Sequence, residues 1–117
     1  MSIELFEQYR DMKISKDQFL NKLDGEQNFN ITEKVVVSSQ HVINLLLALK
    51  NGKITIEQLL DWVNTIWFKD WFKYNEEQED CIASIMSELE ELDEGHKVLS
   101  DEIISQYIFV LKNNIEL

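Results

Sequence analysis

Apolar residues recur at helical spacing along most of the chain. In the segment 35–50, Val42, Leu45, Leu46 and Leu49 follow the i, i+3, i+4, i+7 pattern of an amphipathic helix. The other stripes of expected inward-facing residues are Leu5, Phe6, Tyr9 and Met12; Phe19, Leu20 and Leu23; Leu59, Leu60, Val63 and Ile66; Ile82, Ile85, Met86, Leu89 and Leu92; and Ile104, Tyr107, Ile108 and Leu111. The chain has no proline and only three glycines, which favours helices over turn-rich β structure. We therefore expect an all-α fold, a compact bundle of about five to six helices built from helical hairpins, as a single domain over residues 1–117.

Short polar segments predict where several helices begin. The segments 15–18, 55–58 and 75–78 have the sequence of a capping box. In this arrangement a polar N-cap residue and a Glu or Gln three residues later bond to backbone amides at the start of the helix. Ser100 is the expected N-cap of a last helix over 101–112.

An internal repeat links the first two of these helix starts. Residues 13–23 resemble residues 53–63, and each copy follows an apolar helix and a short turn. A repeat array would offer a concave binding face, whereas helical hairpins that share one turn chemistry would produce the same resemblance. We favour the second interpretation, because the copies are few and dissimilar.

Two segments do not fit a helical pattern. The segment 35–37 consists of three valines and favours a strand, but the sequence shows no clear second strand to pair with it, so we expect an extended lead-in or the start of a helix. The aromatic residues after the fourth helix point in several directions around any single helix, so we expect a helix break near 68–73. These residues are Trp67, Phe68, Trp71, Phe72 and Tyr74. We expect Trp71 and Tyr74 to be partly exposed.

The net charge of −11 is concentrated in one segment. Between Tyr74 and His96 there are nine acidic residues and no lysine or arginine, whereas the other 94 residues hold 13 acidic and 11 basic residues. At 100° per residue, the helix that turns Ile82 and Leu89 inward presents an acidic row on its opposite side. The residues of this row and its flanks are Glu76, Glu77, Asp80, Ser84, Ser87, Glu88, Glu90 and Glu91.

The acidic row has two interpretations. A solvated helix face is usually charged, but such faces normally mix signs in i, i+4 pairs. Here Glu91, Asp93 and Glu94 crowd the helix C-terminus, where the macrodipole disfavours negative charge. We therefore expect a surface that binds a positively charged partner, with aromatic anchors beside it. The expected partner-binding residues are Trp71, Tyr74, Glu76, Glu77, Asp80, Ser84, Ser87, Glu88, Glu91, Asp93 and Glu94.

Residue patterns of catalysis, cofactor binding and metal binding are missing from the sequence. The three glycines are far apart, so no phosphate-binding loop is present. We expect His41 to flank a helix or to be hydrogen-bonded, His96 to lie in an exposed turn, and Cys81 to be inert in the core. A solvated row of carboxylates has no reason to catalyse. We therefore expect no enzyme, no catalytic residue, no cofactor and no metal ligand.

Charge and hydropathy also restrict where the protein acts. The strongly negative balance argues against direct contact with nucleic acid or an anionic membrane surface. The N-terminus has no signal-peptide pattern, and the longest strongly apolar run, 45–49, is far too short to span a membrane. The single cysteine, Cys81, fits a reducing compartment. We expect a cytoplasmic protein, and we leave its oligomeric state open.

The acidic stretch 76–94, the aromatic residues before it and the short all-helical chain together resemble bacterial immunity proteins. These are the antidotes encoded beside colicins and the toxins of contact-dependent growth inhibition. The resemblance implies a basic toxin domain as partner, often a nuclease. It also implies that Asp80, Glu88 and Glu91 would meet lysines and arginines of the toxin, with Trp71 or Tyr74 as apolar anchors. An alternative that uses the same acidic row is a regulatory protein or nucleic-acid mimic that binds a basic host protein.

Overall fold

A mostly helical architecture is present in the computed structural model, which describes residues 4–24, 34–68, 71–91 and 99–115. In chain order the elements are α1 (Glu4–Arg10), α2 (Lys16–Asp24), β1 (Val35–Val37), α3 (Ser39–Lys50), α4 (Ile56–Phe68), β2 (Phe72–Tyr74), α5 (Glu79–Glu90) and α6 (Asp101–Lys112). The predicted all-α bundle of about six helices is confirmed, with one small two-stranded sheet added to it.

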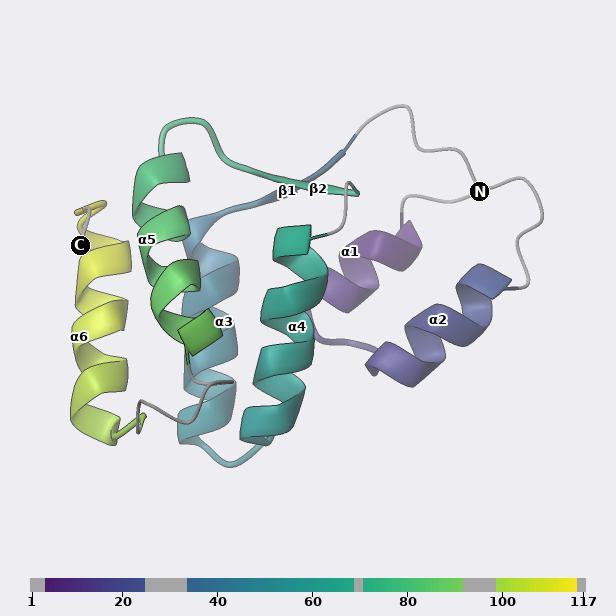
Figure 1. Cartoon of the computed structure of the whole chain (residues 1–117), viewed down its shortest axis with the longest axis horizontal. Helices are drawn as coiled ribbons and strands as arrows, with labels where there is room; N and C mark the ends of the chain where they lie inside the picture. Colours follow the sequence, from purple (N-terminus) through teal and green to yellow (C-terminus); the bar gives the residue numbers. More distant parts are fainter. Residues whose placement is uncertain (1–3, 25–33, 69–70, 92–98, 116–117) are drawn as a thin grey trace.

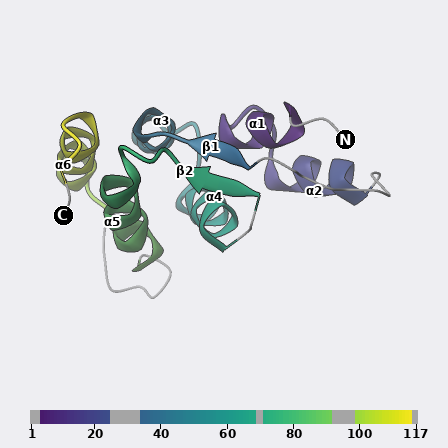
Figure 2. The ribbon, with the colours of Figure 1, turned by 90° about the horizontal axis from the view of Figure 1, so that it is seen from above.

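The helix α3 lies at the centre of the bundle. It packs against α4, α5 and α6, while α1 and α2 pack against each other and α1 also contacts β1. The hairpin of α1 and α2 lies at one end of the molecule and the antiparallel pair of α5 and α6 at the other (Figures 1 and 2). Buried residues from each of these helices and both strands join in one continuous hydrophobic core.

The two copies of the internal repeat fold into the same turn. In the first copy Met12 has a φ of 63°, and in the second Gly52 has a φ of 74°. The amide of the following lysine, Lys13 or Lys53, donates to the carbonyl five residues earlier at 2.8 Å in both copies. This is the Schellman arrangement that ends many helices. The α1–α2 and α3–α4 hairpins therefore share their turn chemistry.

Both predicted capping boxes of the repeat are confirmed. The amide of Ser15 donates to Oε1 of Gln18 at 2.9 Å, and the amide of Gln18 donates to Ser15 Oγ at 3.2 Å. Thr55 and Gln58 make the same two bonds at 2.9 and 3.1 Å. The predicted N-cap Ser100 is also confirmed, because its Oγ accepts the amide of Ile103 at 3.2 Å. Local turn chemistry alone was enough to locate these three helix starts.

The valine segment is an extended strand with a partner, so the expected start of a helix is wrong and the second strand that the sequence did not show is present. β1 pairs in parallel with β2, Val35 opposite Phe72 and Val37 opposite Tyr74. Both valines are buried, whereas Val36 faces outward. The partner strand comes from the aromatic stretch after α4, where the predicted helix break is found. Pairing across that distance in the sequence depends on tertiary packing, which local pattern does not report.

The predicted capping box at 75–78 is wrong. Gln78 does not reach back to its own helix start; its Oε1 accepts the amide of Ser39 at 2.9 Å. α5 therefore begins only at Glu79, with Gln78 as an N-cap residue that makes no side-chain cap bond. The Gln78 side chain satisfies the first turn of α3, which a sequence pattern read along one helix does not reveal.

Burial follows the predicted stripes with a few differences. Leu20, predicted to face inward, is 40% exposed, whereas its neighbour Phe19 is buried at 0% exposure. On α6 the predicted Ile104, Tyr107 and Leu111 are buried, but Val110 is buried as well, while Ile108 is only partly buried against the core. The side chains of Leu23 and Leu92 lie outside the described residues.

Candidate functional site

The helix α5 separates an apolar face from an acidic one, as its sequence predicts. Its buried side chains are Cys81, Ile82, Ile85, Met86 and Leu89. The opposite side carries exposed Asp80 and Ser87, and the adjoining residues Glu76, Glu77 and Glu91 are also exposed. The apolar face packs against α3, α4 and α6. The core contacts therefore orient the acidic face outward.

The exposed acids at the start of α5 differ from Asp11 and Asp61 in how they are paired. In the described part of the chain, no ion pair joins Glu76, Glu77 or Asp80 to a basic side chain. By contrast, Asp61 pairs with Lys16 at 3.6 Å and Asp11 pairs with Arg10 at 2.9 Å. The charges of the acidic face are therefore not used to hold helices together at this end.

The helix macrodipole explains only part of the acidic face. Glu79 and Asp80 lie in the first turn of α5, where negative charge is favourable. The last turn contains no basic residue, although Glu88, Glu90 and the C-cap Glu91 lie there. Acids at that end oppose the dipole, so local helix stability gives no reason for them.

Two residues in the middle of the face, Ser84 and Glu88, are less accessible than Asp80. Ser84 is half-buried, and its hydroxyl donates to the carbonyl of Cys81 at 2.7 Å. Glu88 is also half-buried, whereas Ser87 is exposed. Glu91 lies close to α6, where burial first and the charge of Glu91 second raise the pKa of Tyr107. Two further expected residues, Asp93 and Glu94, lie outside the described residues.

The two expected aromatic anchors are both half-buried, but they face different neighbours. Trp71 packs its ring edge-on against Phe6 and Phe19, with centroids 5.5 and 5.8 Å away. Those rings belong to α1 and α2, at the end of the molecule away from α5 (Figure 1). Tyr74 ends β2 on the side that leads to α5, and burial raises its pKa to about 12. Of the two, the structure brings only Tyr74 near the acidic face.

A polar network joins α1 to the start of α3. Arg10 holds Asp11 with two hydrogen bonds, at 2.9 and 3.3 Å, and donates to the Val36 carbonyl at 3.0 Å. His41 Nδ1 accepts the amide of Ser38 at 2.9 Å, and its Nε2 lies 3.4 Å from Asp11 Oδ1. His41 is thus hydrogen-bonded, one of the two roles expected for it.

This network contains Ser, His and Asp, but its geometry is that of a helix cap. Ser38 Oγ lies 3.1 Å from His41 Nδ1, the same nitrogen that accepts the Ser38 amide. A nucleophile–base pair needs that lone pair for the hydroxyl proton. Burial and the charge of Arg10 also lower the pKa of His41, while Asp11 raises it. The arrangement stabilises the start of α3.

Among the described residues, neither the cysteine nor a group of possible metal ligands is arranged as a reactive site. Cys81 is buried, its Sγ lies 3.5 Å from the Val110 carbonyl, and burial raises its pKa, as expected for inert core. Among the residues that the structure describes, no group of three or more His, Cys, Asp or Glu could hold a metal ion. His96 lies outside them.

Sequence reasoning missed two surface features. A pocket of about 350 Å³ lies between the two hairpin turns, with Trp62 on its wall and lysines around it. Phe109 is 61% exposed on α6. The sequence did indicate that Phe109 is exposed, because this residue falls outside the stripe of inward-facing residues on its helix. The pocket had no such signal, because its two walls are far apart in the sequence.

Comparison with known proteins adds no assignment. No protein-family model matches the chain, no curated protein is similar to it, and no solved structure shares its fold closely enough to match. No helix in the described ranges has the length and apolar character needed to cross a membrane.

Proposed function

We propose that this chain is an immunity protein that binds and neutralises a basic toxin domain, a nuclease, through the acidic face of α5. We define that face by its described residues Glu76, Glu77, Asp80, Ser87 and Glu91. Asp93 and Glu94, also expected to bind the partner, continue the charge along the sequence. The protein acts in the cytoplasm and has no enzymatic activity of its own.

One observation carries this proposal: the negative charge is concentrated in one segment that has no basic residue to balance it. The segment between Tyr74 and His96 has nine acidic residues and no lysine or arginine. Asp80 is exposed and makes no ion pair with any described residue. Like charges this close repel each other, which costs folding stability. A basic partner would relieve that repulsion on binding.

The mechanism is occlusion of the toxin. A concentrated negative surface speeds encounter with a basic partner by roughly ten- to a thousandfold at low salt. Contacts that exclude water then slow dissociation, and aromatic groups are the usual anchors. Tyr74 is suited to this role by its position next to the acidic face. Covering the toxin's active site or its substrate-binding surface would block it equally well.

Growth rescue tests this proposal. The chain is co-expressed with the C-terminal domain encoded immediately upstream of its gene, and colony growth is scored. We expect the upstream domain alone to be lethal and the pair to grow normally. The purified pair should form a complex whose affinity falls as salt rises, since part of the attraction is electrostatic.

Three outcomes would contradict the proposal or the face that it names. A lethal upstream domain that is not rescued, or one that is not toxic, would favour the alternative of a regulatory protein that mimics nucleic acid and binds a basic host protein. A low-salt pull-down from host lysate, followed by competition with duplex DNA, would then identify that partner class. An affinity that does not change with salt would assign the interface to apolar contacts instead of the acidic face.

A further inference from the structure

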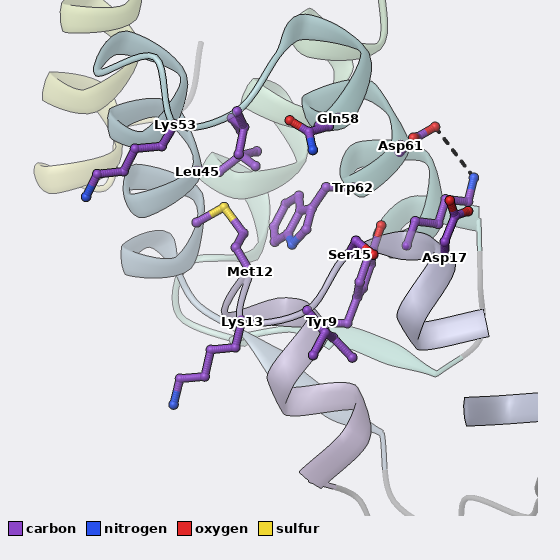
Figure 3. Close-up of a pocket in the computed structure, with 13 residues that line it drawn as sticks. Tyr9, Met12, Lys13, Ser15, Asp17, Leu45, Lys53, Gln58, Asp61 and Trp62 are labelled. Atoms are coloured by element: carbon purple, nitrogen blue, oxygen red, sulfur yellow. Dashed lines mark ion pairs between the residues drawn. The ribbon is translucent and has the colours of Figure 1, made fainter. Parts of the chain in front are cut away.

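The pocket between the two hairpin turns is formed in part by the two copies of the repeat. It is lined by Met12, Lys13 and Ile14 from the first turn and by Lys53 and Ile54 from the second, which occupy equivalent positions in the two copies. Its volume of about 350 Å³ falls within the range of small-ligand sites. The pocket thus lies where two copies of one local structure face each other (Figure 3).

The lining of the pocket mixes apolar and polar side chains, and its tryptophan is held in place. Trp62 is 2% exposed, and its Nε1 donates to the carbonyl of Arg10 at 3.1 Å, so its polar atom is already satisfied. Its ring therefore offers only apolar surface. Met12 and Leu45 lie beside it (Figure 3). Trp62 is thus part of the core behind the pocket, and the partly buried Met12, with its flexible thioether, offers the apolar contact.

Charges around the pocket are divided between two sides. Lys13 and Lys53 are exposed, extend on one side (Figure 3), and make no ion pair within the described residues. On the other side Asp61 pairs with Lys16 at 3.6 Å, next to Asp17. The lining therefore holds three lysines and two aspartates, a positive balance in a chain of net charge −11. The two unpaired ammonium groups favour an anion on their side.

A strained backbone residue contributes its side chain to this wall. Met12 has a φ of 63°, a left-handed conformation that a residue with a Cβ adopts at a cost, while the equivalent residue in the other copy is Gly52. Glycine would relieve the strain at position 12 but would remove the thioether from the pocket and from its contact with the core. Strain that persists with such a side chain is typical of binding sites.

From these observations we propose that the pocket binds a small amphiphilic organic anion. Its apolar body, about the size of one or two rings, lies against the partly buried side chains of Met12, Ile14 and Ile54. Its carboxylate, sulfonate or phosphate group lies between Lys13 and Lys53. The site is on the α1–α4 side of the molecule and is independent of the acidic face of α5, so the two bind partners of opposite charge.

Two fluorescent dyes with the same apolar body test the site. 8-Anilinonaphthalene-1-sulfonate carries the anionic group, and N-phenyl-1-naphthylamine lacks it. Each is titrated at constant ionic strength into the wild type, the double variant Lys13→Gln/Lys53→Gln and the charge-matched control Lys73→Gln/Lys112→Gln. We expect one saturable sulfonate site in the wild type. Removing Lys13 and Lys53 should weaken it by about fivefold, with less than about a twofold effect on the neutral dye and in the control.

A second variant keeps the result interpretable. Met12→Gly should weaken both dyes, because it removes the apolar wall while relieving backbone strain. Cooperative urea unfolding of each variant shows whether dye binding reports the native fold. Equal sulfonate affinity in the wild type and in Lys13→Gln/Lys53→Gln would overturn the anion site. Unchanged affinity of both dyes in Met12→Gly, or several unsaturable dye sites in the wild type, would overturn the pocket as the binding place.

Discussion

Charged residues serve different purposes in the α1–α4 half of the molecule and on α5. In the first half several of them make hydrogen bonds or ion pairs: Arg10 holds Asp11 and the Val36 carbonyl, and Lys16 pairs with Asp61. At the start of α5, Asp80 is exposed and joins no such pair among the described residues. The comparison teaches that charge used for architecture is paired and half-buried, whereas charge available to a partner is exposed and uncompensated.

The largest expected effect is on stability, at Arg10. Its side chain is 15% exposed and bonds to Asp11 and Val36, so Arg10→Met should destabilise the fold by about 2 kcal/mol. Asp80→Asn should change stability by less than about 0.5 kcal/mol, because Asp80 is exposed. Urea unfolding followed by circular dichroism measures both. Equal losses would remove the distinction between architectural and available charge.

The next effect is on partner affinity. Asp80→Lys/Glu91→Lys should weaken binding to the toxin domain by about tenfold, or about 1.4 kcal/mol, because it places like charges opposite each other. The matched control is Glu57→Lys/Glu102→Lys, which changes net charge equally at first-turn acids of α4 and α6. Titration calorimetry at low salt compares the two. A control that weakens binding as much would assign the effect to net charge, not to the face.

A smaller effect on stability is expected at the two hairpin turns, and it differs between them. Gly52 has a φ of 74°, and a Cβ added there would meet nothing within 4 Å. Gly52→Ala should therefore cost about 1 kcal/mol through backbone conformation alone. Met12→Gly relieves the same strain but loses apolar contacts, so its net change should be smaller. Thermal unfolding measures both, and no destabilisation by Gly52→Ala would contradict the Schellman assignment.

The smallest expected effect is on the pH dependence of stability. Burial and Arg10 lower the pKa of His41 from its usual 6.5 in the folded state, so the unfolded chain binds that proton more tightly. The contribution is fully present above about pH 6.5 and is lost as the pH falls below it. His41→Gln should flatten this loss, since glutamine already serves as the N3 residue in the capping boxes at Gln18 and Gln58.

The control for this prediction is His96→Gln, which removes the other imidazole. The free energy of unfolding is measured in urea between about pH 5 and 8, the range in which histidine titrates. We expect the wild-type slope in His96→Gln and a shallower one in His41→Gln. The reverse order would show that the network at the start of α3 does not carry the pH dependence.

The sequence was sufficient wherever a structure depends on residues close together in the chain. Apolar spacing placed the helices, and the local pairs Ser15–Gln18 and Thr55–Gln58 located two helix starts. The division of α5 into an apolar and an acidic face also follows from spacing within one helix. It could therefore be predicted before any tertiary contact was known.

Tertiary structure decided what depends on segments that are distant in the sequence. It paired Val35–Val37 with Phe72–Tyr74, took Gln78 to the start of α3, and turned Trp71 toward α1 and α2. It also brought the two repeat turns together around one pocket. The physical reason is that hydrogen bonds across the fold and shared burial are set by the packing of whole elements. The helix or turn that contains a residue determines the side on which its side chain lies. It does not determine which other element packs against that side.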